Sequence, residues 1–152
     1  MTVIANVPIS SDYGYVILVA GAFCFNLYTT GVSVGFQRRK HNIPYPDMGC
    51  GPYANKLELK DWTEFNNYQR AHYNYIESFG IVMTSLLVGG VFYPRLQAAL
   101  GAAHLVGRIL YTYGYQKSGP QSRYKGALLF YPGFLGMVGV LFYSGAKLAI
   151  GF

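Results

Sequence analysis

Charged residues are scarce in this sequence, and acidic residues are the scarcest. Lysine, arginine, aspartate and glutamate together make up 12% of the 152 residues, and only six of them are acidic. A typical soluble domain carries about 25%. The charges are also unevenly placed, since none occurs between Asp12 and Arg38. This shortage argues against a soluble globular domain and indicates a protein embedded in a membrane.

The sequence has only two cysteines and three histidines, and none of them is spaced like a set of metal ligands. Cys24 and Cys50 form neither a disulfide framework nor a CxxC pair, and we expect both to be reduced. The three histidines, His41, His72 and His104, lie far apart without ligand spacing, so the sequence predicts no metal site. We expect His104 to serve as a packing or helix-contact residue. No glycine loop follows a strand, which leaves a nucleotide site without support.

Long apolar runs alternate with the charged segments. Residues 15–34 form an uncharged run long enough to cross a hydrocarbon core of about 30 Å. No lysine or arginine precedes this run and it is too long for an h-region, so we do not interpret it as a cleavable signal peptide. The length fits one domain over residues 1–152. The sequence thus predicts an all-α bundle of four transmembrane helices, with spans at 13–36, 66–93, 96–115 and 126–148.

The net charge is +6, and most of the basic residues lie in two loops rather than on one face. The loop after the first span holds Arg38, Arg39, Lys40, Lys56 and Lys60, and the loop after the third span holds Lys117, Arg123 and Lys125. By the positive-inside rule both loops are cytosolic and both termini lie across the membrane. Because no aromatic residues alternate with these cations on a soluble face, we expect no nucleic-acid partner.

The second helix is predicted to begin outside the membrane. Prolines and glycines favour an extended loop over residues 37–61. Asp61 and Glu64 then have the spacing of a capping box, which predicts a helix start near Trp62. Farther along, Gly133, Gly136 and Gly139 follow Pro132, and such small residues let transmembrane helices approach closely.

Polar residues follow this helix into the membrane. Arg70, Asn74 and Glu77 are spaced i, i+4, i+7, which places them on one helix face. Charged groups at the centre of a span cost roughly 2.5–3.5 kcal/mol each, so they rarely persist without a partner or a task. Two readings stay open at this point, since the face either binds a ligand or holds a structural Arg70–Glu77 ion pair.

The third span carries a matching polar face. Arg108, Tyr111 and Tyr115 are spaced i, i+3, i+7, and Glu77 and Tyr113 are equally distant from the turn near Arg95. At 1.5 Å per residue, Arg108 lies about 7 Å deeper than Glu77. The two faces therefore predict an arginine-rich pocket, open to the cytosol and flanked by lipid. Such a pocket suits a water-soluble anion that must meet a lipid-borne partner.

Two segments in particular are recognisable. The run FNNYQRAHYNYIE at residues 65–77 and the run GRILYTYGY at 107–115 resemble the family of membrane-associated proteins in eicosanoid and glutathione metabolism (MAPEG). A YG pair before span one, a basic cluster followed by YP at 45–46 and GGVxxPR at 89–95 extend the similarity over nearly the whole chain. Together, RAHxNxxE and GRxLYxYGY make this resemblance specific.

The resemblance implies a homotrimer that binds glutathione as co-substrate between neighbouring subunits, with no metal. The implied glutathione-binding residues of one subunit are Arg70, Asn74, Glu77, Tyr111 and Tyr115, and those from the adjacent subunit are Arg38 and His72. Arg123 matches the family arginine near the glutathione sulfur and is the implied catalytic residue, with Lys125 as the alternative. Ser78 departs from the pattern, because some relatives have a tyrosine there.

The implied activity is a membrane-bound glutathione transferase acting on lipophilic electrophiles, with glutathione-dependent reduction of lipid hydroperoxides as an added activity. Leukotriene-C synthase and a non-catalytic lipid-binding scaffold are the alternatives. The implied location is the endoplasmic reticulum membrane, or else the mitochondrial outer membrane, with the site facing the cytosol. A transporter is the least favoured reading, since the polar groups gather at one side of the bilayer.

Overall fold

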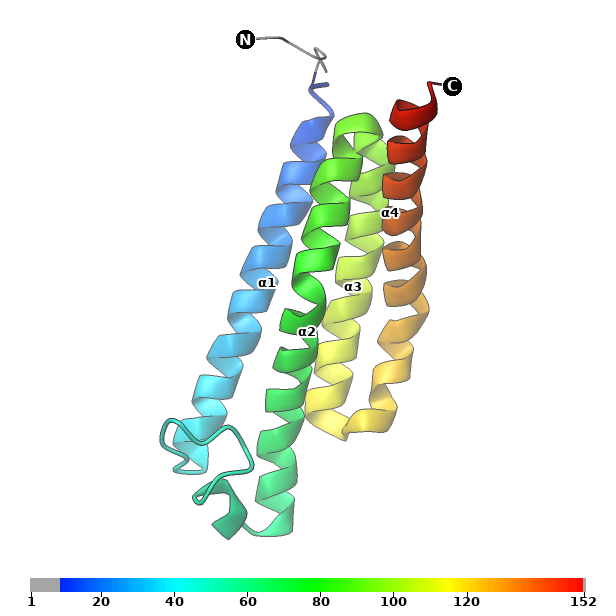
Figure 1. The fold of residues 1–152 in the computed structure, drawn as a ribbon. Helices are drawn as coiled ribbons and strands as arrows, with labels where there is room; N and C mark the ends of the chain where they lie inside the picture. Colours follow the sequence, from blue (N-terminus) through cyan, green and yellow to red (C-terminus); the bar gives the residue numbers. More distant parts are fainter. Residues whose placement is uncertain (1–8, 152) are drawn as a thin grey trace.

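The chain folds into four long helices that lie side by side (Figure 1). The computed structural model describes residues 9–151. Its elements are α1 (Tyr13–Lys40), η1 (Ala54–Lys56), α2 (Leu59–Phe92), α3 (Pro94–Ser118), η2 (Pro120–Arg123) and α4 (Tyr124–Ile150), where η denotes a 3₁₀ helix. The predicted all-α bundle is confirmed. Residues 1–8 and 152, which the domain prediction includes, lie outside the described residues.

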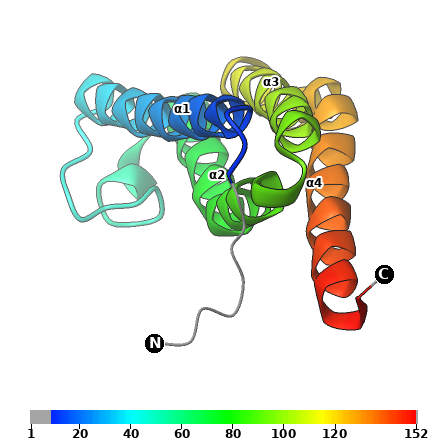
Figure 2. The same cartoon turned by 90° about the horizontal axis from the view of Figure 1, so that it is seen from above.

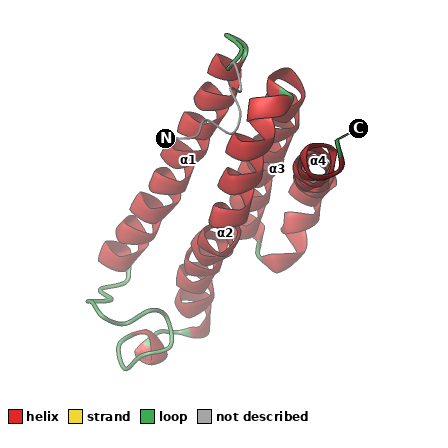
Figure 3. Cartoon of the chain, turned by 45° about the horizontal axis from the view of Figure 1, so that its top comes forward, coloured by secondary structure: helices red, strands yellow, loops and turns green. Residues whose placement is uncertain are grey.

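Successive helices run in opposite directions, so the two ends of the bundle differ. α1 begins and α4 ends at one end, whereas the α1–α2 connection and η2 lie at the other, here called the loop end (Figure 1). α1 packs on α2 and α3, and α4 packs on α3 and α2 (Figure 3). Seen from above, α1 and α4 extend in different directions from the α2–α3 pair (Figure 2). Both basic loops therefore lie together at the loop end.

α3 is the least apolar of the four helices. α1, α2 and the segment Pro120–Ile150 are long and apolar enough to cross a membrane. α3 instead carries Gln97, His104 and Arg108, which are all at most 1% exposed. Gln97 donates to two backbone carbonyls, and a ring nitrogen of His104 lies 2.9 Å from the Phe130 carbonyl oxygen. The neighbouring helices thus shield the polar side chains of α3, and the packing role expected for His104 is confirmed.

Glycines allow α3 and α4 to pack backbone to backbone. A Cβ atom on Gly107 or Gly126 would collide with main-chain atoms of the facing helix. A Cβ atom on Gly133 would lie 2.8 Å from the backbone nitrogen of His104. By contrast, a Cβ on Gly139 would meet nothing within 4 Å. The close approach predicted around Pro132 is therefore correct for Gly133 but not for Gly139.

The start of α2 differs from the prediction. The helix begins at Leu59 with Glu58 as N-cap, and no side chain caps it, so the predicted start near Trp62 is wrong. The reason is that the Glu64 carboxylate does not reach back to its own helix start. It accepts hydrogen bonds of 2.6 Å from Lys40 Nζ at the end of α1. Lys40 itself belongs to α1, so the predicted loop over 37–61 is shorter and covers residues 41–58.

A buried carboxylate organises this loop. Asp47 is 5% exposed and accepts four backbone N–H bonds of 2.8 to 2.9 Å, from Gly49, Gly51, Tyr53 and Ala54. Burial alone would raise the pKa of the Asp47 carboxyl, but these donors outweigh it and lower the pKa from 3.8 to about 2. Because the folded-state pKa lies below the unfolded value, the stabilisation is complete above about pH 4 and is lost as the pH falls toward 2.

Replacing Asp47 by asparagine should therefore loosen the loop at neutral pH. We expect a loss of about 1–3 kcal/mol in unfolding free energy, because the charged acceptor of four donors is removed. Trp62 is the only tryptophan and packs against the loop's buried cluster, so its fluorescence during thermal unfolding in detergent reports on this region. The difference from wild type should be constant between about pH 5 and 7 and shrink toward pH 2.

The matched control is Asp12→Asn, whose carboxylate pairs with Arg95 at the opposite end of the bundle. This variant should leave the Trp62 transition unchanged. A difference between Asp47→Asn and wild type that is the same at pH 3 and pH 7 would show that the charge of Asp47 does not hold the loop.

Candidate functional site

A fully buried arginine lies at the centre of the predicted pocket. Arg108 of α3 is 0% exposed. Its guanidinium donates to Asn74 Oδ1 at 2.6 Å, to the Asn74 carbonyl oxygen at 3.1 Å and to Ser78 Oγ, all on α2. From the helical rise of 1.5 Å per residue, the sequence predicted that the Arg108 backbone lies about 7 Å deeper than that of Glu77. The long side chain nevertheless reaches the turn of α2 that carries Asn74 and Ser78.

No carboxylate neutralises this arginine. Among residues 9–151, the ion pairs are Lys40–Glu64, His41–Glu64 and Arg95–Asp12. The charge of Arg108 is instead surrounded by aromatic rings, with ring centroids 4.7 Å away for Tyr75, 5.3 Å for Tyr111 and 4.7 Å for Phe130. Cation–π contacts and three acceptors on α2 therefore hold the buried cation in place.

The arginine fixes the orientation of the Asn74 amide. A guanidinium only donates hydrogen bonds, so the Asn74 atom facing it must be the oxygen. The Nδ2 group consequently turns away from Arg108, and within the described part of the chain no protein acceptor is bonded to it. Asn74 is only half-buried. The side chain thus presents two hydrogen-bond donors toward the accessible face of α2.

Arg70 and Glu77 lie on this same face and are exposed. In the described residues the two form no ion pair with each other, so the purely structural reading of them has no support in the chain's own contacts. The Arg70 cation, the Asn74 amide donors and the Glu77 anion thus lie along one face of α2, where a ligand can reach them.

The tyrosines and Arg123 extend the site onto α3 and η2. The rings of Tyr111 and Tyr115 are 6.0 Å apart, with Tyr111 buried and Tyr115 half-buried. Arg123 ends η2, and its guanidinium lies 5.4 Å from the centroid of the Tyr124 ring. Lys125 instead lines a shallow apolar hollow along α4. Of the two candidate cations, Arg123 thus contacts an aromatic ring, whereas Lys125 lies along the apolar hollow of α4.

Arg38 and His72 lie at a second feature, a groove of about 980 Å³ between α1 and α2. Its walls are apolar away from the loop end and basic toward it, and they include Tyr28, Val32, Phe36, Arg38, Arg39, Tyr45, His72 and Ile76. His72 Nδ1 lies 2.8 Å from Thr30 Oγ1 on α1. The groove therefore combines an apolar channel with cations at one end.

Arg38 has a structural task in this groove. It is 6% exposed, and its guanidinium donates to the Asp47 carbonyl at 2.6 Å and to Met48 Sδ at 3.2 Å. The neighbouring Arg39 lines the same groove and is exposed. Part of the hydrogen-bonding capacity of Arg38 is thus used by the 41–58 loop, whereas Arg39 is more accessible.

The two features lie on different faces of α2. His72 follows Arg70 by two positions, which corresponds to about 200° around a helix. The structure brings together Asn74, Arg108, Ser78 and Tyr111 on one side and Arg38 with His72 on the other. A single copy of the chain thus displays two separate sets of candidate residues, and one ligand cannot touch both sets in the same copy.

Three residues at these features were absent from the predicted site. Arg108 was placed with Tyr111 and Tyr115 on the polar face of the third span, but it was not included among the implied glutathione-binding residues. Ser78 was noted only for the missing tyrosine, whereas its hydroxyl accepts from Arg108 and donates to the Asn74 carbonyl oxygen. Arg39 was placed only in the basic loop. Spacing alone does not show which of two adjacent arginines is buried.

The sequence model of the MAPEG family matches residues 16–143, a range that contains nearly all of the four helices and both features described above.

Proposed function

Because the chain belongs to the MAPEG family, we propose that it is a membrane-bound glutathione transferase that joins the glutathione thiolate to lipophilic electrophiles. Family membership supports a glutathione-dependent activity in a membrane at the general level. Within the family we propose the greatest likeness to microsomal glutathione S-transferase 3, carried by the RAHxNxxE and GRxLYxYGY segments. Reduction of lipid hydroperoxides with glutathione is part of the same proposal.

The observation that carries this proposal is the Arg108–Asn74 contact beside two exposed charges, Arg70 and Glu77, that form no ion pair within residues 9–151. A buried cation fixes Asn74 as a donor, and Arg70 and Glu77 remain exposed on the same face. Burying an unpaired arginine is costly, and this cost is hard to explain if the face served packing alone. A non-catalytic scaffold would not need such an arrangement.

Glutathione has a group for each part of this face. The guanidinium fork of Arg70 matches a carboxylate bidentately and never loses its charge. Glu77 is suited to the ammonium, and Asn74 Nδ2 to a carboxylate or carbonyl oxygen. The hydroxyls of Tyr111 and Tyr115 supply further hydrogen bonds for a half-buried peptide.

A homotrimer would unite the two features of the chain. We propose that the α1–α2 groove of one copy, with Arg38 and His72, faces the polar face of α2 and α3 in the next copy. Since Arg38 is partly engaged with its own loop, we extend this contribution to Arg39. The apolar part of the groove then offers a lipophilic acceptor access from the membrane to a bound thiol.

We propose the endoplasmic reticulum membrane as the location, with the loop end in the cytosol. The charge distribution supports this orientation, because the loop end carries most of the basic residues and the hairpin at Tyr93 carries only Arg95. Glutathione would then reach the site directly from the cytosol.

An assay of purified protein in detergent tests the proposal. We expect retention on immobilised glutathione and glutathione-dependent turnover of a nitroaromatic halide, with a lipid hydroperoxide as a second substrate. Turnover of a leukotriene epoxide alone would identify a leukotriene-C synthase instead. Failure to bind glutathione, in a preparation whose circular dichroism shows a folded helical bundle, would favour the scaffold and overturn the proposal.

A further inference from the structure

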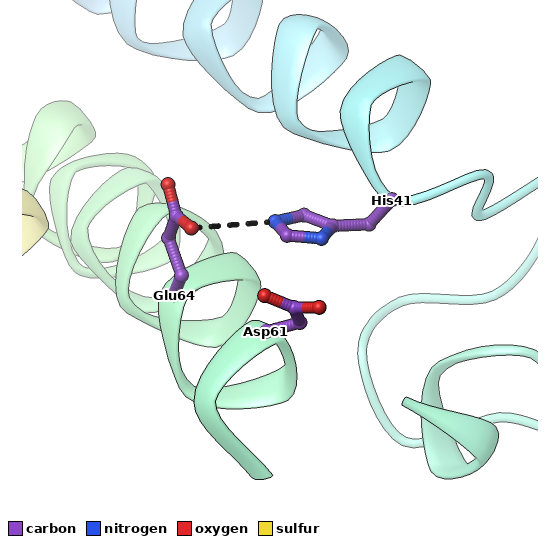
Figure 4. A group of neighbouring side chains, drawn as sticks. All are labelled: His41, Asp61 and Glu64. Atoms are coloured by element: carbon purple, nitrogen blue, oxygen red, sulfur yellow. Dashed lines mark ion pairs between the residues drawn. The ribbon is translucent and has the colours of Figure 1, made fainter. Parts of the chain in front are cut away.

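A histidine and two carboxylates converge at the loop end, next to the basic end of the α1–α2 groove but outside its lining. His41 directly follows α1, and Asp61 and Glu64 lie in the first turns of α2 (Figure 4). One potential ligand atom from each residue lies within 4.8 Å of the others. His41 is far from the two carboxylates in sequence, so spacing alone did not reveal the cluster.

The His41 ring is buried and aimed into this cluster. Its side chain is 4% exposed, and Nε2 lies 3.6 Å from Glu64 Oε2, too far for a hydrogen bond (Figure 4). Within residues 9–151 this nitrogen has no hydrogen-bond partner. A buried polar atom without a partner is uncommon in folded proteins and calls for an explanation.

From this geometry we propose that His41, Asp61 and Glu64 bind a divalent transition-metal ion of the Zn²⁺ class. One imidazole with two carboxylates is a ligand set suited to such ions, whereas Mg²⁺ and Ca²⁺ prefer oxygen ligands throughout. Ligand atoms around Zn²⁺ lie roughly 3–3.5 Å apart, given bond lengths near 2.0–2.2 Å. Asp61 and Glu64 are only partly buried, so both carboxylates can rotate to close the remaining gap.

Lys40 is the group with which the ion competes. Its ammonium lies 2.6 Å from both Glu64 oxygens, and its side chain is 54% exposed. Exposed ion pairs of this kind are weak, and a displaced ammonium is readily solvated. With His41 neutral, the cluster and Lys40 together carry one net negative charge, so electrostatics favours a divalent ion over the ammonium.

The bound ion would join the end of α1 to the start of α2. It would thereby close the 41–58 loop, whose backbone accepts hydrogen bonds from Arg38 beside the α1–α2 groove. The proposed role is structural stabilisation of the loop end, independent of the glutathione chemistry. An ion that binds only the folded chain raises the thermal midpoint as its concentration increases.

The test uses the full chain in detergent, free of a polyhistidine tag and first treated with a chelator. Titration with Zn²⁺ by calorimetry should give one ion per chain, and Co²⁺ should develop the visible absorption of a low-symmetry site. His41→Gln, Asp61→Asn and Glu64→Gln should each weaken Zn²⁺ binding at least tenfold. Replacing a residue that only hydrogen-bonds to a metal ligand already lowers metal affinity by about tenfold or more.

Glu58→Gln is the matched control, because it removes a carboxylate one turn away and outside the cluster. It should leave Zn²⁺ affinity within twofold of wild type. The Asp61 side chain makes no hydrogen bond in the described structure, so Asp61→Asn keeps the test valid even if His41→Gln fails to fold. Absence of Zn²⁺ binding to wild type, or equal weakening by Asp61→Asn and Glu58→Gln, would overturn the proposal.

Discussion

Replacing Asn74 by aspartate should lower glutathione affinity about a hundredfold while leaving the helical bundle at least as stable as before. The amide oxygen already faces Arg108, and a carboxylate there gives the buried cation an ion-pair partner. The Nδ2 donor is lost in the same change. A hydrogen bond to a charged group is worth about 1.5–3 kcal/mol, or roughly ten- to a hundredfold in affinity. In the variant a carboxylate oxygen takes the place of Nδ2 and faces the ligand's own oxygen, which lowers the affinity further.

Two quantities are measured for each variant: glutathione affinity by calorimetry and the thermal midpoint of unfolding by circular dichroism. Asn74→Ala should lose affinity and also stability, because Arg108 then lacks its side-chain acceptor. Asn55→Asp, at an exposed position of η1, makes the same chemical change outside the proposed site and should leave glutathione affinity unchanged. If Asn74→Asp binds glutathione as wild type does, the amide is not a donor to the ligand.

Replacing Arg123 by alanine should lower turnover at pH 7 by about a hundredfold and leave glutathione affinity within a few-fold of wild type. Arg70 and the cations of the α1–α2 groove remain for the glutathione carboxylates, so Arg123 is free to act on the thiol. It ends η2, the segment that directly follows the tyrosine-bearing end of α3.

Lowering the thiol pKa accounts for only part of this effect. A change from about 8.5 to about 6 raises the thiolate fraction at pH 7 roughly thirtyfold. Nucleophilicity falls with pKa at a slope of about 0.4–0.5, which leaves a net gain of about two- to threefold. A donor that stabilises charge developing in the transition state is worth roughly 10²–10³. A hundredfold loss would therefore indicate that Arg123 acts mainly on the transition state.

The ultraviolet absorbance of the thiolate allows its ionisation to be titrated on the bound ligand. In Arg123→Ala the apparent thiol pKa should rise toward that of the free thiol. Lys125→Ala is the neighbouring control and should preserve both titration and turnover. A normal titration and normal turnover in Arg123→Ala, with losses in Lys125→Ala, would transfer the role to Lys125. If neither variant loses activity, proximity of thiol and acceptor would suffice for catalysis.

The sequence by itself determined the fold class, the number of helices and the grouping of the basic loops at one end. These follow from local properties, namely the length of apolar runs and the positions of charges between them. Helical periodicity likewise placed Arg70, Asn74 and Glu77 on one face. The resemblance to the MAPEG family rested on two motifs and agrees with the match over residues 16–143.

Only the tertiary structure decided which polar groups meet across helices. The contact of Arg108 with Asn74 and Ser78 depends on how far a long side chain reaches from α3 to α2. The true start of α2 depends on Lys40 drawing Glu64 away from a capping role, a contact between segments far apart in sequence. His41, Asp61 and Glu64 converge for the same reason, since spacing along one chain does not encode the packing of two helix ends. Local periodicity fixes a residue's face, whereas its partner depends on the register and tilt at which the helices pack.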